Sequence, residues 1–376
     1  MLKKTPQSLF KRKSIMLMLT YECNLNCVYC YEKKKHPSKT MPLETAKCII
    51  EKIFAENDKV CEEIEFDFMG GEPLLEFDRM KEIAEWMWSC TWNKPYILYA
   101  TTNGTLLNDG MKAWFIQHKE RIVLGLSYDG SPEMQNQNRN SSAVNIDIKY
   151  FITTWPFQPF KMTLSKETVG QLYKGVTYLH RVGMHKVHAN LAFGLDWTLK
   201  TLDAFAKQLV LLIDFYVVNP ELERVSLLNL DVTVIFHKTD APKYCGTGSG
   251  TELVDYDGRV FPCHIISPVT LSTEQLKVIA QVDFENKSCF ANPICETCML
   301  VSICPNCYGM NLLHTGDLKK RFPVLCKGFI IQFMANCKLQ AKLLTRKKEL
   351  TEKEKKLAYA LIIINKSKIR KKKNYE

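Results

Sequence analysis

Three cysteines near the start of the chain have the spacing of a metal-binding loop. Cys23, Cys27 and Cys30 are separated by three and by two residues, and they follow an apolar run at 15–20 that we predict to be a β-strand. Three thiolates can bind three of the four irons in a [4Fe–4S] cube, whereas a structural zinc site takes four protein ligands. The odd number therefore indicates a cluster whose fourth iron is open to a small molecule. A chance triplet or half of a zinc site is the alternative.

A second set of cysteines occurs later in the chain. Its seven members are Cys245, Cys263, Cys295, Cys298, Cys304, Cys307 and Cys326. Pairs separated by two residues are typical of iron–sulfur clusters and also of zinc ribbons.

Three further motifs each follow a predicted strand. They are Gly70, Gly71, Glu72 and Pro73; Asn103; and Ser127 and Asp129, with Arg139 farther along. Glycine lets a ligand approach the backbone because it has no Cβ. The Glu72 carboxylate can accept a hydrogen bond from an ammonium group, Pro73 fixes a turn, and Arg139 can bind a carboxylate through two hydrogen bonds. Ordinary turns are the alternative, because Asn-Gly and Asp-Gly are common turn pairs.

Alternating apolar and amphipathic segments predict how these motifs are positioned. We predict strands at 15–20, 63–69, 96–102, 122–127, 160–164 and 186–193, and helices at 43–56, 77–89, 111–118, 143–154, 169–181 and 199–215. Six strand–helix units predict parallel strands in an α/β fold, as a partial (β/α)6 TIM-like barrel. The motifs would then share the rim at the carboxyl ends of the strands.

Changes in charge, in strand–helix alternation and in cysteine content divide the sequence into five parts. We expect a basic lead-in at 1–14, the partial barrel at 15–217, a bridging segment at 218–244, a small cysteine-rich domain at 245–328, and a C-terminal helix with a basic tail at 329–376. A hairpin is predicted inside the cysteine-rich domain, around Tyr256, Asp257 and Gly258.

Composition limits the cell compartment and the partners. The chain has 376 residues, 15 cysteines and a formal charge of +11. No apolar run reaches the ~20 residues of a membrane span, and the basic N-terminus lacks the features of a signal peptide. Many cysteines at metal-ligand spacing favour a reducing cytoplasm. The basic ends are either solvated or attract an acidic peptide or another polyanion. Nucleic acid is not expected, because no recognition motif for it occurs.

The first cysteine loop, with Tyr29 as its aromatic residue, resembles the radical S-adenosylmethionine (SAM) family. In that family SAM binds the open iron through its amino and carboxylate groups, and an electron from the cluster cleaves it to a 5′-deoxyadenosyl radical. The resemblance implies that residues 70–73 bind the SAM amino group. It also implies that Asn103, Ser127, Asp129 and Arg139 line the SAM pocket, with Ser127 and Asp129 toward the ribose.

The second cysteine set resembles the SPASM extension of radical SAM peptide-modifying enzymes, which carries two auxiliary [4Fe–4S] clusters. The resemblance implies three clusters in total. One auxiliary cluster would be held by Cys295, Cys298, Cys304 and Cys326, and the other by Cys245, Cys263 and Cys307. The second cluster is then one ligand short of the eight thiolates that two cubes need. Either Cys289 supplies that ligand, or one iron is open to a substrate thiolate or to water. One departure is the C-x2-C spacing of Cys304 and Cys307, where the family often has three intervening residues.

His264 follows Cys263 directly, where sulfatase-maturating relatives carry an aspartate base. A neutral imidazole there can act as a base or order the ligand loop, and a plain surface or supporting histidine is the alternative. Pro262-Cys263-His264 is similar to peptide maturases that build thioether or carbon crosslinks.

The expected function is therefore maturation of a ribosomally synthesised and post-translationally modified peptide (RiPP). The enzyme would abstract a hydrogen from a precursor peptide to form a crosslink or thioether. Flavodoxin or ferredoxin would supply electrons. With strand one starting near residue 15, the leader would be bound by a separate protein, by the barrel mouth or by the basic tail. Anaerobic sulfatase maturation and a zinc-stabilised binding module are the alternatives.

Overall fold

The computed structural model describes residues 10–32, 39–56, 61–236 and 245–367. The chain divides into two compact units. The first comprises Met1–Ser127, Ser142–Pro156 and Ala241–Cys289, and the second comprises Tyr128–Ser141, Phe157–Asp240 and Phe290–Glu376. Within the described ranges, no helix combines the length and the apolar character needed to cross a membrane.

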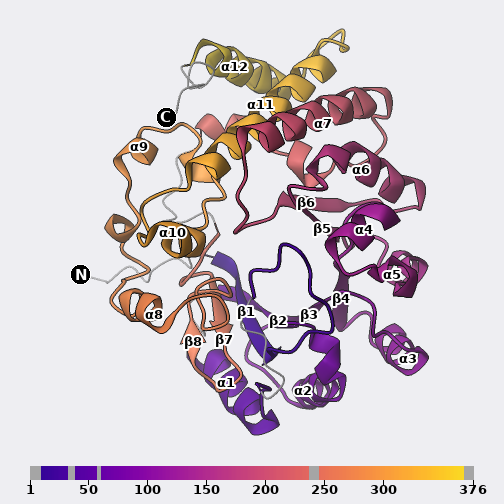
Figure 1. Ribbon diagram of the computed structural model, residues 1–376, viewed down its shortest axis with the longest axis vertical. Helices are drawn as coiled ribbons and strands as arrows, with labels where there is room; N and C mark the ends of the chain where they lie inside the picture. The colour runs from indigo at the N-terminus through magenta and orange to yellow at the C-terminus, as the bar shows by residue number, and fades with distance from the viewer. Residues whose placement is uncertain (1–9, 33–38, 57–60, 237–244, 368–376) are drawn as a thin grey trace. The chain divides into compact units, whose positions relative to one another are not determined.

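The first unit is built on a six-stranded sheet in the order β4-β3-β2-β1-β7-β8 (Figure 1). The strands are β1 (Phe10–Thr20), β2 (Cys61–Gly70), β3 (Tyr96–Thr102), β4 (Ile122–Leu126), β7 (Thr251–Val254) and β8 (Val260–Phe261). Neighbours from β4 through β7 are parallel, and β7 and β8 form an antiparallel hairpin. The carboxyl ends of β1 to β4 therefore meet at one edge of the sheet.

Helices follow the strands of this unit and bury apolar faces. They are α1 (Leu43–Glu56), α2 (Phe77–Ser89), α3 (Asp109–Gln117), α5 (Ile148–Thr154) and α8 (Thr273–Ile279). The ring of Phe54 in α1 lies 5.6 Å from the ring of Phe66 in β2. Consecutive β1 residues, including Leu17, Met18 and Leu19, are fully buried. Burial on both faces is typical of a parallel strand.

The second unit contains a two-stranded parallel sheet and most of the long helices. Its elements are β5 (Phe160–Leu164), β6 (Val187–Leu191), α4 (Pro132–Asn138), α6 (Leu172–Arg181), α7 (Leu199–Val218), α9 (Pro293–Glu296), α10 (Tyr308–Thr315), α11 (Pro323–Leu344) and α12 (Glu352–Lys366). A core of Phe329, Phe333 and Cys337 from α11 with Ala360 and Ile364 from α12 holds its C-terminal part together.

The predicted α/β fold with parallel strands is confirmed, and so is the hairpin around residues 256–258. Two details differ. The six predicted strands lie in two sheets, because β5 pairs only with β6 among the described strands, while the hairpin pairs with β1. The predicted single C-terminal helix is wrong: α11 ends at Leu344 and α12 begins at Glu352. Thr351 caps α12 by accepting from the backbone N–H of Glu354, whose carboxylate accepts in return from the Thr351 backbone N–H.

Candidate active site

The first three cysteines lie on one short loop directly after β1. Cys23, Cys27 and Cys30 are free thiols of intermediate burial. The Cys30 N–H donates to the Cys27 carbonyl at 3.1 Å, which closes a turn around Tyr29. The N–H of the buried Leu25 points at Cys23 Sγ at 3.4 Å. A short loop that carries all three thiols, with a backbone donor directed at one of them, suits a cluster held by three cysteines.

Two glycines let this loop lie against the end of β2. The Gly71 N–H donates to the Thr20 carbonyl at 3.1 Å, and the Glu72 N–H donates to the Glu22 carbonyl at 2.8 Å. A Cβ on Gly71 would stand 2.3 Å from the Glu22 carbonyl oxygen and 2.8 Å from Cys23 Cβ. At Gly70 it would stand 2.5 Å from the Thr20 carbonyl oxygen. Both glycines are therefore needed so that the end of β1 and the cysteine loop can pack against them, whether or not a ligand is bound.

Glu72 joins the ends of β2 and β3. Its side chain is buried, with 1% of its surface exposed. The carboxylate accepts from Thr102 Oγ1 at 2.7 Å, from the Asn103 N–H at 2.7 Å and from the Leu74 N–H at 3.1 Å. From the sequence we expected this carboxylate to accept a hydrogen bond from an ammonium group of a ligand. In the structure it accepts hydrogen bonds from three groups of the protein. Glu72 thus positions the loop after β3, and Pro73 next to it starts a short 3-10 helix, Pro73–Glu76.

Asn103 connects that loop to the cysteine loop through a closed ring of three side chains. Asn103 Nδ2 donates to Asn24 Oδ1 at 2.9 Å, and Asn24 Nδ2 donates to Thr105 Oγ1 at 2.8 Å. Thr105 Oγ1 donates in turn to Asn103 Oδ1 at 2.7 Å. Sequence reasoning missed Asn24, which lies inside the cysteine motif, and Thr105, which lies two residues after Asn103. Ser127 completes this edge, because its N–H donates to the Thr102 carbonyl at 2.9 Å.

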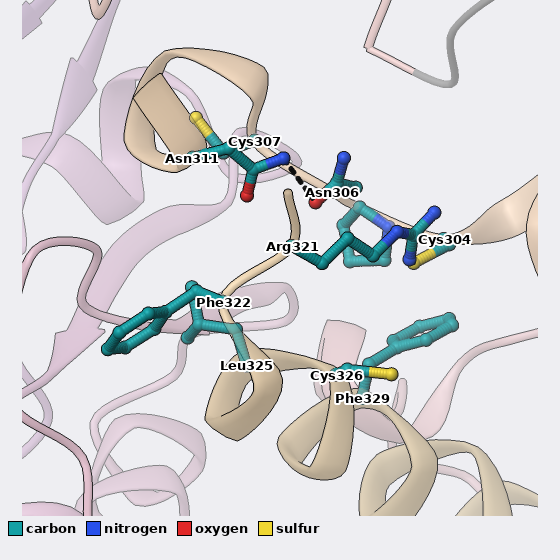
Figure 2. A pocket seen from close by; sticks show the side chains of 10 residues that line it. Cys304, Asn306, Cys307, Asn311, Arg321, Phe322, Leu325, Cys326 and Phe329 are labelled. Carbon is teal, nitrogen blue, oxygen red and sulfur yellow. Dashed lines mark hydrogen bonds between the residues drawn. The ribbon is translucent and has the colours of Figure 1, made fainter. Parts of the chain in front are cut away.

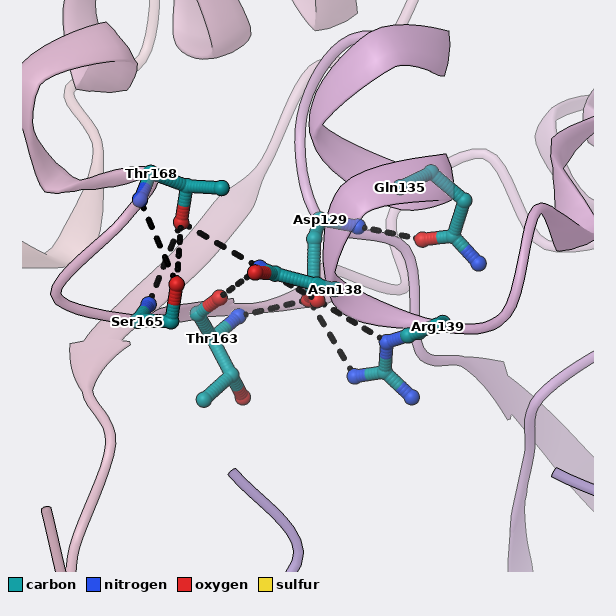
Figure 3. Close-up of polar contacts among 7 residues, drawn as sticks. All are labelled: Asp129, Gln135, Asn138, Arg139, Thr163, Ser165 and Thr168. Carbon is teal, nitrogen blue, oxygen red and sulfur yellow. Dashed lines mark hydrogen bonds and ion pairs between the residues drawn. The ribbon is translucent and has the colours of Figure 1, made fainter. Parts of the chain in front are cut away.

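Asp129 and Arg139 belong to the second unit and bind each other. Arg139 Nε and Nη2 donate to the Asp129 carboxylate at 3.0 and 3.1 Å. The Thr163 N–H and Asn138 Nδ2 donate to the same carboxylate at 2.9 and 3.0 Å. Figure 3 shows that all of these groups converge on Asp129, which is fully buried, while Arg139 is 8% exposed. The carboxylate that Arg139 binds thus belongs to the protein itself. In this geometry the Arg139–Asp129 pair stabilises the segment after β4.

Four cysteines of the second unit influence one another electrostatically. Burial, followed by the charge of Cys304, raises the pKa of Cys326 to about 11, and Cys298 and Cys295 add to the rise. Arg321 Nη1 donates to Cys304 Sγ at 2.8 Å. Figure 2 shows Arg321, Cys304 and Cys326 around a small cavity of ≈ 30 Å³. Partly buried thiols that repel one another as thiolates fit a metal cluster. Nothing in the sequence identified Arg321 as their neighbour.

Cys245 and Cys263 are neighbours in the first unit. Burial raises the pKa of the Cys263 thiol, and the Cys245 charge also raises it. His264 Nδ1 lies 3.3 Å from Met16 Sδ of β1, and its ring lies 5.4 Å from the ring of Tyr31, which follows the first cysteine loop. Tyr31 was not singled out in the sequence.

The remaining two cysteines of the predicted auxiliary site lie in different units. Cys289 ends a 3-10 turn of the first unit, and Cys307 precedes α10 in the second. In the described residues, no three His, Cys, Asp or Glu side chains converge tightly enough for a single metal ion. In a cube each thiolate binds a different iron, so its ligands are spread more widely.

Comparison with known proteins gives both sequence relatives and structural neighbours. A family model described as a 4Fe-4S single cluster domain matches residues 13–147. An uncharacterized protein of Methanocaldococcus jannaschii is 29% identical over 187 residues, 48% of this chain and 62% of that protein. A cysteine-type anaerobic sulfatase-maturating enzyme of Clostridium perfringens strain 13 is 29% identical over 128 residues, 31% of this chain and 32% of the enzyme. The alignments span less than two thirds of either relative.

Two solved structures share the fold. The enzyme anSMEcpe with bound AdoMet and a Kp18Cys peptide gives a TM-score of 0.66 at 18% identity, over 86% of this chain and 96% of that one. SuiB of Streptococcus suis bound to the precursor peptide SuiA gives 0.58 at 16% identity, over 83% and 75%. The chain therefore has the fold of these two proteins, and its sequence is similar to an iron–sulfur cluster domain and to part of an anaerobic sulfatase-maturating enzyme.

Proposed function

We propose that the protein is a RiPP maturase: it cleaves SAM to a 5′-deoxyadenosyl radical, which abstracts a hydrogen from a precursor peptide to form a crosslink or thioether. One observation carries the proposal. The cysteine loop, Gly71, Glu72 and Asn103 are tied to one another by hydrogen bonds at the carboxyl edge of a parallel sheet. Active sites of barrel-like α/β enzymes form at this edge.

The cofactors supply the difficult chemistry and the protein positions them. Cys23, Cys27 and Cys30 would hold the [4Fe–4S] cluster to which SAM binds. The backbone around Gly71 and the loop at Asn103 would form one wall of the SAM site. Their positions are fixed by Glu72, whose buried carboxylate spans both segments.

Two auxiliary [4Fe–4S] clusters complete the proposed cofactor set. Cys295, Cys298, Cys304 and Cys326 would hold one, with Arg321 donating to Cys304. The other would be held by Cys245, Cys263 and Cys307, with Cys289 or an exchangeable ligand in the remaining position. His264 next to Cys263 would take the proton released from the peptide, because the unperturbed imidazole pKa of about 6.5 suits neutral pH.

A peptide substrate is supported by the neighbours, since anSMEcpe and SuiB were each solved with a peptide bound. Sulfatase maturation is the second candidate, because the Clostridium perfringens relative carries that name. His264 favours the crosslinking reaction over it, as an aspartate base is expected in sulfatase maturases. Flavodoxin or ferredoxin would supply the electron in the cytoplasm, and the leader would be bound by a separate protein, by the barrel mouth or by the basic tail.

The test uses full-length protein reconstituted anaerobically with iron and sulfide. Three clusters predict about 12 irons per chain and release of 5′-deoxyadenosine from SAM. A variant with Cys23, Cys27 and Cys30 changed to alanine is the control, and it should lose about four irons and the cleavage. Zinc at full occupancy without iron–sulfur absorption would contradict the proposal.

The product separates the two candidate reactions. Short peptides encoded beside the gene are incubated with the enzyme and analysed by mass spectrometry. A crosslink removes two hydrogens and keeps the sulfur, whereas formylglycine formation at a cysteine replaces sulfur with oxygen. The second result would move the assignment to sulfatase maturation.

A further inference from the structure

A large cavity lies in the second unit, within a part of the chain that the proposed chemistry does not use. It has a volume of ≈ 680 Å³, within the range of ligand-binding pockets. Its walls come from the C-terminal end of α7, the segment after it, the last turns of α11, the connection to α12 and the start of α12. Figure 1 shows α7, α11 and α12 grouped within this unit.

The walls of the cavity are held by hydrogen bonds between its elements. Gln340 Nε2 of α11 donates to the Leu230 carbonyl at 2.6 Å, and the Leu230 N–H donates to Asn336 Oδ1 at 2.8 Å. Arg346 donates to the Val217 carbonyl at the end of α7. Because its walls are already ordered, such a cavity binds a ligand without losing conformational entropy in the protein.

The lining combines an apolar surface with a positive rim. Five partly exposed leucines line it, namely Leu222, Leu230, Leu343, Leu344 and Leu357. Four cationic residues, Arg224, Arg346, Lys347 and Lys353, face only two acidic ones, Asp231 and Glu354.

Both acidic side chains already have partners. Asp231 accepts from the Thr233 N–H and hydroxyl at 2.9 and 2.7 Å. Glu354 pairs with Lys347 and caps α12. By contrast, Arg224 and Lys353 form no ion pair with any carboxylate in the described part of the chain, and the Arg346 guanidinium donates to the Val217 carbonyl, which carries no full charge. The rim therefore offers positive charge to an incoming anionic group.

We infer that this cavity binds an acidic, leucine- or aromatic-containing segment of the substrate peptide, outside the residues that are modified. This rests on the proposed peptide-maturase function. The charge excludes the basic ends of the chain as occupants, because residues 368–376 carry five basic side chains and one acidic. The leucines favour a peptide with apolar side chains over a phosphate polyanion, which offers none in that position.

Binding of a synthetic peptide to the full chain tests the inference. The probe is a fluorescein-labelled twelve-residue peptide of glutamate, leucine and phenylalanine, followed by anisotropy. Two further probes replace its glutamates with glutamine or its apolar residues with serine, and a fourth is single-stranded DNA of equal charge. We expect only the first probe to bind well, with an affinity that falls as salt is added.

Charge reversal at the rim gives the site-specific comparison. Arg224→Glu with Lys353→Glu should weaken the first probe by about tenfold or more, because two attractions of the rim for the acidic peptide become repulsions. Lys200→Glu with Lys207→Glu is the matched control, since both are exposed lysines of α7 outside the cavity. Leu222→Ser should weaken binding without altering charge.

Several results would overturn the inference. They are equal loss in the two charge-reversal variants, undiminished binding of the glutamine probe, preferential binding of DNA, or no binding at all. SAM cleavage by the reconstituted protein is measured separately. Its absence would refute the proposed function, while peptide binding lost only in the rim variant would still establish the cavity as a peptide site.

Discussion

Gly71→Ala should displace the first cysteine loop. The new methyl carbon would lie 2.3 Å from the Glu22 carbonyl oxygen, 2.7 Å from the Glu22 carbonyl carbon and 2.8 Å from Cys23 Cβ. Two of these three atoms are backbone, so no side chain can rotate away, and ordinary contact requires the loop to move by roughly 1 Å. Overpacking of this kind costs about 1–3 kcal/mol. The hydrogen bond from the Gly71 N–H to the Thr20 carbonyl, worth about 1 kcal/mol, would weaken as well.

Gly170→Ala is the matched control. No atom lies within 4 Å of a Cβ at Gly170, so this variant should change the free energy of unfolding by less than about 1 kcal/mol. Urea unfolding of the metal-free protein, followed by tryptophan fluorescence, should show a loss of about 2–4 kcal/mol for Gly71→Ala alone. After anaerobic reconstitution, this variant should lack about four irons and bind SAM poorly. Equal stability and equal iron content in the two variants would refute the packing argument.

Four other substitutions test separate contacts. Arg139→Ala leaves the Asp129 carboxylate buried without its cation and should lower the free energy of unfolding by about 3–5 kcal/mol in urea titrations; a loss below about 1 kcal/mol would mean that the pair is not buried as described. Arg321→Gln removes a charge-assisted hydrogen bond to Cys304, a ligand of the proposed first auxiliary cluster, and should lower the reduction potential of that cluster by roughly 65–130 mV in an EPR-monitored titration, with Arg321→Lys in between; an unchanged or higher potential would contradict this. Cys289→Ala should leave iron content and activity intact if the proposed second auxiliary cluster keeps an open iron, whereas loss of about four irons would make Cys289 a ligand. Thr351→Ala removes the cap of α12 and should cost about 1 kcal/mol in thermal unfolding, and no change would show that α12 does not depend on this cap.

The strands and the convergence of their carboxyl ends could be predicted because both depend on local pattern. Apolar runs mark β1 to β4, and glycine or asparagine marks the turn after each of β2 and β3. The partners of Glu72 and Arg139 could not be predicted in this way. Each carboxylate or guanidinium meets groups on another segment, and a single sequence carries no record of that pairing. The same applies to Arg321 beside Cys304.

The break between α11 and α12 could have been predicted, because the sequence contains a pattern that marks the start of a helix. Thr351 followed three residues later by Glu354 is a capping box, and the structure uses it as one. The apolar spacing continues on both sides of the break, so periodicity alone suggested one uninterrupted helix.

The sequence predicted only part of the role of Gly71. We expected that a Cβ at this position would block the approach of a ligand. In the structure, a Cβ there would instead clash with the chain's own Glu22 carbonyl.

The position of β7 has a consequence for how the protein is made. Ser14 of β1 pairs with Thr251 of β7, so the two partners leave the ribosome more than two hundred residues apart. At typical translation rates of about 5–20 residues per second, this interval lasts roughly 10–50 s. During that time one edge of β1 has no partner from the hairpin, and its apolar run is a template for pairing with another nascent chain. Contacts between segments so distant in sequence also fold slowly. The six-stranded sheet of the first unit can therefore be completed only late in synthesis. Until then, another part of the chain or a chaperone must cover the free edge of β1 to prevent pairing with other chains.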